Sequence, residues 1–318
     1  MRTSDKPFLT YNQQIKKLTD KGLMISDYDT ALQLLKEHSY FALISGYKNP
    51  FKAKNGMYKP HVTLDDVFAL YSFDDTLRNT ILSNILKVEK HIKSLISYSF
   101  CETYGEEQQH YLNATKYNYS AANQSEINNL IGRLSKIASN PKDYSYIMHQ
   151  KQKHGNIPLW VMMKALPLGS VSKLYSFLPQ NIQCKVSIEF DQITENELVR
   201  MLDLLARIRN VCAHNERLFN YRYNKGAIND TYIHKHLNIP KHNVQYKKGK
   251  QDLFAVIITL KYLLSENEFS YFIEEIHTAL EKLLTSTRQL QRSQMYKYMG
   301  FPSNWTEIQN APLKPCAH

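Results

Sequence analysis

Apolar residues recur at intervals of three and four along almost all of this 318-residue chain, and sustained period-two alternation is nearly absent. Glycine and proline, the residues that most disfavour helix interiors, number only 10 and 11. Helical spacing of this kind buries one stripe of each helix against its neighbours. The sequence therefore predicts an all-α fold: a helical-bundle core with additional N-terminal and C-terminal helices.

Capping boxes predict where three helices begin. In such a box, a Ser or Thr and an acidic residue three positions later bond each other's backbone N–H. Thr194 with Glu197 precedes an apolar stripe over residues 198–208, and Ser265 with Glu268 precedes another over residues 269–283. A box with aspartate in the acidic position begins at Thr63. It predicts a long helix to about residue 104, either unbroken or interrupted at residues 73–75.

These patterns divide the chain into four segments. Residues 1–60 form an N-terminal helical segment that ends in an aromatic-rich connector. Residues 61–220 form the helical core. Residues 221–250 form a basic, irregular insertion, and residues 251–318 form C-terminal helices that pack on the core.

The chain has a surplus of positive charge, with 40 lysines and arginines against 29 acidic residues and a pI near 9.2. That surplus favours a polyanionic partner, and RNA, DNA and membrane surfaces all qualify, although a merely solvated basic surface is the alternative. The strongest apolar run, residues 253–264, contains Lys261 and is too short to span a bilayer. It predicts a buried helix, so we expect no membrane association.

The cysteines predict neither a zinc site nor disulfides. They lie far apart and form no C-x-x-C pair, and free thiols fit a reducing cytoplasm. The N-terminus lacks the apolar core of a signal peptide, so we expect a cytoplasmic protein. No carboxylate cluster suited to paired magnesium ions is present, and we expect neither a metal nor a cofactor. The four cysteines are Cys101, Cys184, Cys212 and Cys316.

One short motif carries the side chains needed for RNA cleavage without a metal. Arg209 and Asn210 are followed by His214, near the end of the helix that Thr194 begins. An arginine grips phosphate through a fork of donors, and a histidine exchanges protons near neutral pH. With ten arginines and twelve histidines in the chain, about one such spacing is expected by chance. The context of the motif must therefore decide its meaning.

On an ideal helix, Arg209 lies about 140° away from His214. Either the helix ends or distorts before His214, or the Arg209 side chain curls round, or the site forms where two copies of this helix meet. Arg207 is nearly aligned with His214 and is a rival for phosphate binding. The polar face that we expect to point into a cleft contains Arg200, Arg207, Asn210, His214 and Arg217. The alternative is that these arginines are ordinary surface residues and His214 a helix-end histidine.

Glu89 falls on the inward side of its predicted helix, where a carboxylate needs a partner. It either orients Arg209 or forms an ion pair with Lys93, four residues further on. Six lysines are candidates for guiding RNA, although those after residue 225 fit a solvated loop equally well. These are Lys87, Lys90, Lys93, Lys247, Lys248 and Lys250.

Five separate blocks, in order along the chain, resemble one family. They lie at residues 38–51, 68–105, 168–175, 209–220 and 298–305, and include S-G-Y…P-F, G-S-V-S-K-L-Y and R-N-V-C-A-H-N-E-R-L-F-N. Together they resemble the Abi-like proteins of bacterial abortive infection, of the AbiD/AbiF type, which are regarded as members of the HEPN superfamily. The chain departs from the first block, with Phe41-Ala42 where an aromatic–arginine pair is usual.

The resemblance implies an all-α HEPN-type core and a metal-independent ribonuclease with Arg209, Asn210 and His214 in its active centre. Some HEPN proteins bind RNA without cutting it, which is the alternative function. HEPN nucleases usually pair two motifs, so a chain with one motif is expected to form a homodimer. The resemblance also implies a structured noncoding RNA that restrains the toxin. A nucleotide- or protein-modifying activity lacks support, because no Gly-rich phosphate loop is present.

Overall fold

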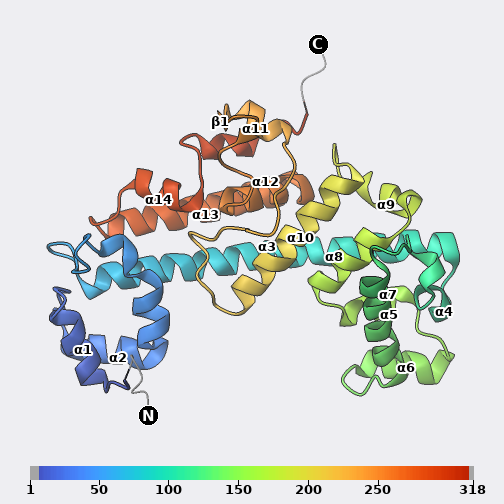
Figure 1. Cartoon of the computed structure of the whole chain (residues 1–318), viewed down its shortest axis with the longest axis horizontal. Coiled ribbons are helices and arrows are strands. Elements are labelled where there is room, and N and C mark those ends of the chain that lie inside the picture. The colour runs from blue at the N-terminus through green and yellow to red at the C-terminus, as the bar shows by residue number, and fades with distance from the viewer. Residues whose placement is uncertain (1–6, 315–318) are drawn as a thin grey trace.

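A computed structural model describes residues 7–314 of the chain, and within them helices dominate, which confirms the predicted all-α fold (Figure 1). The first half contains α1 (Tyr11–Thr19), α2 (Tyr28–His38), α3 (Leu64–Tyr104), α4 (Gln108–Tyr111), α5 (Gln124–Ser139) and α6 (Ser145–His154). The second half contains α7 (Leu159–Met162), α8 (Leu168–Phe177), α9 (Gln180–Ser187), α10 (Glu195–Ala213), α11 (Tyr232–His236), α12 (Leu253–Leu263), α13 (Glu266–Ser286) and α14 (Arg292–Met299). Short turns are η1 (Phe41–Ser45), η2 (Asn49–Phe51), η3 (Ala114–Lys116), η4 (Met163–Ala165) and η5 (Trp305–Asn310).

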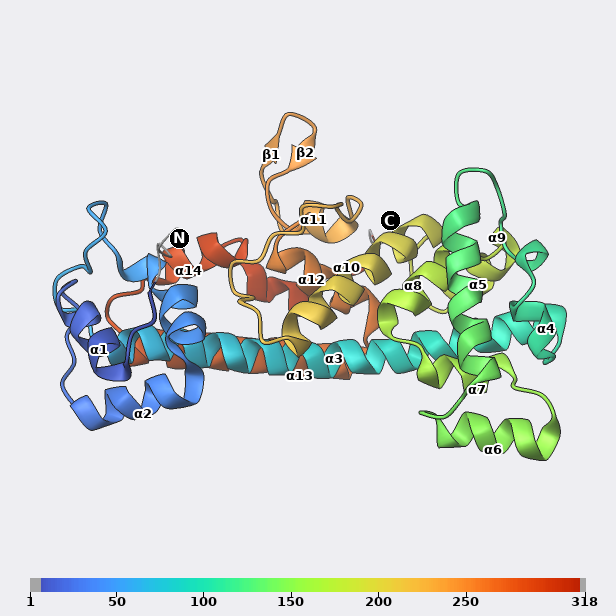
Figure 2. The ribbon, with the colours of Figure 1, turned by 60° about the horizontal axis from the view of Figure 1, so that its bottom comes forward.

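The long helix α3 is the spine of the molecule. Its 41 residues extend about 60 Å at 1.5 Å per residue. The helices α1 and α2 lie at one end of α3, α4 to α9 gather at the other, and α10 and α13 pack against its middle (Figure 2). The capping box at Thr63 and the stop at Gly105 are both confirmed. The helix runs unbroken through residues 73–75, because the buried Asp74 within it finds hydrogen-bond partners outside α3.

The apolar run that predicted a buried helix forms α12, in which every residue is buried. Lys261 is only 7% exposed, and its ammonium group donates to the carbonyl of Gln309 at 2.8 Å. Burial lowers the pKa of Lys261. Over residues 7–314, no helix has both the length and the apolar character needed to cross a membrane.

The segment 221–250, predicted to be irregular, is partly structured. It contains α11 and a small antiparallel hairpin of β1 (Lys241–His242) and β2 (Gln245–Tyr246). The segment is anchored by His234, which is fully buried. The backbone N–H of Thr231 donates to its Nδ1 at 3.1 Å, so Nε2 carries the proton and donates to the carbonyl of Gly249 at 2.9 Å. Sequence periodicity missed these elements because they are too short to show a period.

Two buried groups beside Gly249 have shifted pKa values that act in opposite directions on stability. Burial lowers the pKa of His234 to about 4, so below pH 6.5 the unfolded chain takes up a proton that the folded chain excludes. The contribution of His234 is therefore complete above pH 6.5 and is lost as the pH falls towards 4. Burial raises the pKa of Asp252 to about 6, so between pH 4 and 6 its contribution falls as the pH rises.

A His234→Gln variant should separate these opposing effects. Glutamine does not titrate, so the difference in unfolding free energy between the unmodified chain and the variant should narrow by about 2 kcal/mol from pH 7 to pH 5. Asp252 is present in both proteins, and its contribution cancels in the difference. The measurement is urea unfolding at each pH. A difference that stays constant over this range would show that His234 does not titrate as described.

Candidate functional site

The helix α10 positions the Arg209–His214 motif. The predicted capping box is present: the Thr194 side chain accepts from the backbone N–H of Glu197, and the Glu197 carboxylate accepts from that of Thr194 at 2.9 Å. The predicted apolar stripe is buried against α3 and α8. Asn210 and His214 are both exposed.

The helix ends immediately before the motif histidine. Its last residue is Ala213, and His214 is the C-cap. Asn215 follows in the left-handed conformation, with φ 53°. Its backbone N–H donates to the carbonyl of Cys212, and the N–H of Glu216 donates to the carbonyl of Val211 at 3.0 Å. This pair of bonds is a Schellman motif, which satisfies the last helical carbonyls and turns the chain sharply. The expectation that α10 ends before His214 is confirmed, so the ideal helical wheel does not describe its direction.

The left-handed turn makes a prediction about residue 215. Asparagine tolerates positive φ, whereas a β-branched side chain does not. An Asn215→Val variant should lower the free energy of unfolding by about 1–2 kcal/mol. An Asn215→Gly variant should remain close to the unmodified chain, because glycine accepts this conformation freely. Urea unfolding of the three proteins tests the point, and equal stability of the valine and glycine variants would contradict it.

Within residues 7–314, the motif arginine Arg209 forms no ion pair with a carboxylate. Arg209 is half-buried, and its Nε is buried without a hydrogen-bond partner in the described part of the chain. Arg207 differs, because its Nε lies 3.5 Å from Asp203 and its guanidinium stacks 5.3 Å from the centre of the Tyr223 ring. The Tyr223 hydroxyl also bonds Asp203. These contacts favour Arg209 over Arg207 as a ligand for phosphate.

The polar face of α10 is less open than the sequence predicted. The chain after residue 220 folds back along α10, where Tyr223 covers Arg207 and the carbonyl of Ala227 accepts from Arg200 at 3.4 Å. Arg200, Asn210, His214 and Arg217 are exposed, whereas Arg207 is half-buried. The returning chain therefore narrows the middle of this face and leaves both of its ends accessible.

Glu89 does not hold Arg209, which corrects one of the two interpretations open from the sequence. Its Oε1 accepts from the ammonium of Lys93 at 2.6 Å, four residues along α3, and its Oε2 is buried without a partner in residues 7–314. A carboxylate on the inner side of a helix can reach the i+4 position more easily than a separate element. Glu89 therefore forms the local ion pair.

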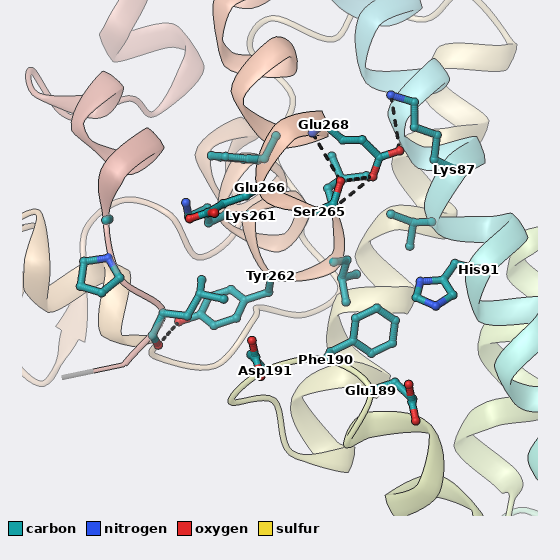
Figure 3. Close-up of a pocket in the computed structure, with 17 residues that line it drawn as sticks. Lys87, His91, Glu189, Phe190, Asp191, Lys261, Tyr262, Ser265, Glu266 and Glu268 are labelled. Atoms are coloured by element: carbon teal, nitrogen blue, oxygen red, sulfur yellow. Dashed lines mark hydrogen bonds and ion pairs between the residues drawn. The ribbon is translucent and has the colours of Figure 1, made fainter. Parts of the chain in front are cut away.

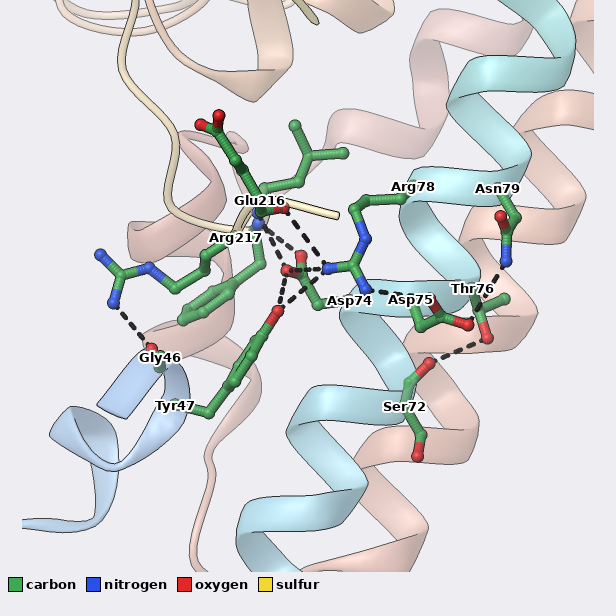
Figure 4. Close-up of polar contacts among 12 residues, drawn as sticks. Gly46, Tyr47, Ser72, Asp74, Asp75, Thr76, Arg78, Asn79, Glu216 and Arg217 are labelled. Carbon is green, nitrogen blue, oxygen red and sulfur yellow. Dashed lines mark hydrogen bonds and ion pairs between the residues drawn. The ribbon is translucent and has the colours of Figure 1, made fainter. Parts of the chain in front are cut away.

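A buried polar cluster fixes the turn that carries His214 (Figure 4). Asp74 of α3 is fully buried and accepts four hydrogen bonds. These come from Tyr47 Oη at 2.6 Å, Arg78 Nη1 at 2.9 Å, and the backbone N–H groups of Leu218 at 2.9 Å and Phe219 at 2.6 Å. We call this cluster of Tyr47, Asp74, Arg78, Leu218 and Phe219 the Asp74 clamp.

The Asp74 clamp joins three parts of the chain at one carboxylate. Burial raises the pKa of the Asp74 carboxyl, while the four donors oppose that shift. A second contact reinforces the junction: Arg217 Nη1 donates to the carbonyl of Gly46, beside Tyr47, at 2.7 Å. Residues 217–219, which directly follow the turn that carries His214, are therefore held at three points. Arg217 anchors this turn, so its role is structural in this arrangement.

The sequence carries a local signal for the Asp74 clamp. Asp74 and Arg78 stand four residues apart among apolar positions of a predicted helix, as a buried ion pair requires. Such a pair costs free energy unless further hydrogen bonds satisfy it. Donors from elsewhere in the chain were therefore to be expected.

The six predicted RNA-guiding lysines differ in their surroundings. Lys93 bonds Glu89, Lys250 bonds Asp230 at 2.6 Å, and Lys248 donates to the carbonyl of Phe301 at 2.6 Å. Lys90 and Lys247 are exposed. Together with Lys87, which bonds Asn84, four of the six thus have structural contacts, and the six do not form one surface.

Lys87 borders a separate cavity of about 710 Å³ between α3 and the start of α13 (Figure 3). Its ammonium bonds Asn84 at 3.1 Å and lies 4.0 Å from Glu268, whose other oxygen belongs to the capping box of α13. The cavity mixes charges of both signs and is not lined by Arg209, Asn210 or His214. In residues 7–314, no group of three or more His, Cys, Asp or Glu side chains is arranged to hold a metal ion.

Comparison with models of known protein families matches residues 33–220 to the family described as Abi-like protein. The matched stretch is more than half of the chain, and it contains the whole Asp74 clamp as well as the Arg209–His214 motif. No curated protein and no solved structure matches this chain.

Proposed function

Because this chain belongs to the Abi-like protein family, we propose that it is a metal-independent endoribonuclease of the HEPN type that acts in phage defence. Family membership itself suggests a role in abortive infection. The ribonuclease activity and its active centre, at the C-terminal end of α10, are our proposal. One observation carries it: Arg209, which has no carboxylate partner within residues 7–314, and the exposed Asn210 lie in the last two turns of α10, and the exposed His214 caps the helix just before the chain is held by the Asp74 clamp.

The proposed chemistry is transfer of the scissile phosphorus from one ribose oxygen to another. The 2′-hydroxyl attacks the adjacent phosphorus, the bond to the 5′ oxygen breaks, and the products are a 2′,3′-cyclic phosphate and a 5′-hydroxyl. His214 either takes the proton of the 2′-hydroxyl or gives one to the leaving oxygen. Arg209 stabilises the charge that grows on the phosphoryl oxygens, and Asn210 bonds a phosphate oxygen or the imidazole.

Two proton transfers need two groups, and the chain has one motif histidine. We propose that two copies of the chain form a homodimer and that His214 of each copy faces a shared cleft. Arg207 does not enter this centre, because the Asp203 carboxylate already pairs with it, and Arg217 anchors the turn through the carbonyl of Gly46. A protein that sediments as a monomer at micromolar concentration and still cuts RNA would contradict the shared cleft.

The test of the activity is the chemistry of the products. In EDTA, the purified protein should convert single-stranded RNA into fragments with 2′,3′-cyclic phosphate and 5′-hydroxyl ends. The same RNA with 2′-O-methyl groups should bind but remain intact, because it has no attacking hydroxyl. Tight, salt-sensitive binding of both RNAs without cleavage of either would instead support a non-catalytic binding protein, which sequesters a structured RNA. A structured noncoding RNA that restrains the nuclease should inhibit cleavage in the same assay.

A further inference from the structure

Two cavities of about 510 and 380 Å³ lie beside each other over the first turns of α10, the chain after it and α14. They share Arg222, Lys247 and Asp252 in their walls and therefore form one elongated groove. We call it the basic groove. Its cations come from α10, the segment 221–250 and α14: Arg200, Arg222, Lys247, Lys248, Lys250 and Lys297.

Backbone carbonyls, rather than carboxylates, hold several of these cations. Arg222 donates to the carbonyls of Tyr221 at 2.8 Å, Tyr298 at 3.0 Å and Lys297 at 3.3 Å. Lys248 donates to the carbonyl of Phe301. Neutral acceptors fix the direction of a cationic side chain without cancelling its charge. The groove is thus both ordered and positive.

Two acidic residues, Asp230 and Asp252, line the groove and offset part of this charge. Asp230 bonds Lys250 at 2.6 Å. Of the six cations, Lys250 alone forms an ion pair within 4.0 Å of a described carboxylate. Asp252 is 7% exposed and is used by the backbone, where its Oδ1 accepts from the N–H groups of Gly249 at 3.0 Å and Ala255 at 3.2 Å. Arg200, Arg222 and Lys248 donate to carbonyls, and the exposed Lys247 and Lys297 have no ion pair with a described carboxylate, so the groove keeps a surplus of positive charge.

We propose that the basic groove binds the phosphodiester backbone of the RNA strand at a distance from the cleaved bond. The identity of the polymer rests on the proposed ribonuclease function. Arg200 precedes His214 by fourteen residues, which is about 21 Å along α10. A phosphate at the Arg200 end of the groove is thus too far away to be the scissile one. Cations that are spread along a groove suit successive phosphates better than one compact anion, which requires converging donors.

The Tyr246 ring in the groove wall is already occupied by two contacts. The His234 ring lies with its centroid 4.8 Å away, and the ammonium of Lys241 lies 4.4 Å from the Tyr246 centroid. A base that stacks on this ring has to compete with these contacts, so the cations of the groove are expected to supply most of the binding. Binding should be strong in low salt and largely independent of base sequence.

The test measures RNA affinity separately from cleavage, in the His214→Ala background with 2′-O-methyl single-stranded RNA. The test pair is Lys247→Glu with Lys297→Glu, and the control pair is Lys142→Glu with Lys153→Glu, two exposed lysines outside the groove. The test pair should weaken binding roughly tenfold. It should also make the negative slope of log K against log salt shallower by about 1.4, which is about 0.7 for each lost phosphate contact. The control pair should keep the slope.

If both pairs weaken RNA binding equally, the proposal that the groove binds RNA is wrong, because the loss then reflects only the change in net charge. Equal competition by inorganic polyphosphate or double-stranded DNA would overturn its assignment to an RNA strand. The same two lysine substitutions, made in a chain that keeps His214, separate the groove proposal from the nuclease proposal. If only the groove proposal is wrong, this variant cleaves RNA with the KM of the unmodified chain. If only the nuclease proposal is wrong, the variant binds RNA more weakly and neither protein cleaves it.

Discussion

Replacement of Asp74 by alanine is expected to lower the free energy of unfolding by about 3–5 kcal/mol, because it removes one partner of a buried ion pair. Arg78 is only 2% exposed and would lose its fully buried carboxylate. The N–H groups of Leu218 and Phe219 would lose their acceptor as well. Each unsatisfied buried donor adds to the cost. Urea unfolding measures the change.

Asp75→Ala is the matched control, since Asp75 also bonds the Arg78 guanidinium, at 2.9 Å, but its side chain is 49% exposed. Exposed pairs contribute roughly 0–1 kcal/mol, so this variant should lose far less stability than Asp74→Ala. Similar losses in the two variants would show that the Asp74 clamp does not hold the fold together.

The Asp74 clamp also makes a functional prediction that separates positioning from stability. In a folded Asp74→Asn variant at low temperature, the turn at His214 is less firmly held, because the charge that binds Arg78 and the backbone is lost. The kcat of this variant should fall. Its affinity for RNA should stay within about twofold of that of the unmodified chain, because the basic groove determines that affinity. An equal fall in affinity would indicate general loss of structure.

Much of the framework could be predicted from the sequence. The capping boxes at Thr63, Thr194 and Ser265 are local signals, and each one begins a helix where expected. The apolar stripe of α10 likewise identified its buried side. Such signals depend on residues three or four positions apart, which the fold cannot easily override.

The partners of the charged residues could not be predicted in the same way. Tyr47 and Leu218 bond an aspartate that is 27 and 144 residues away, and a helical pattern carries no information about such pairs. The side of α10 that carries Arg207 was expected to be open to solvent, because the residues of α10 on that side are polar. The segment that covers it, at Tyr223, returns from a region without periodicity.

Replacement of His214 by alanine is expected to reduce RNA cleavage by 10²- to 10⁴-fold, the usual contribution of a positioned general acid or base. His214 is exposed at the C-cap of α10, so its removal should leave the free energy of unfolding nearly unchanged. RNA affinity should also persist, because the basic groove is intact. His149→Ala, at an exposed position on α6, is the control and should cut at the rate of the unmodified chain.

The most direct test of the proposed active centre is the single-turnover rate constant for RNA cleavage in EDTA, with protein in excess over RNA. We predict that the His214→Ala variant, folded and bound to RNA, cuts at least 100-fold more slowly than the unmodified chain. A variant that cuts at the unmodified rate would contradict the assignment of the active centre to the end of α10.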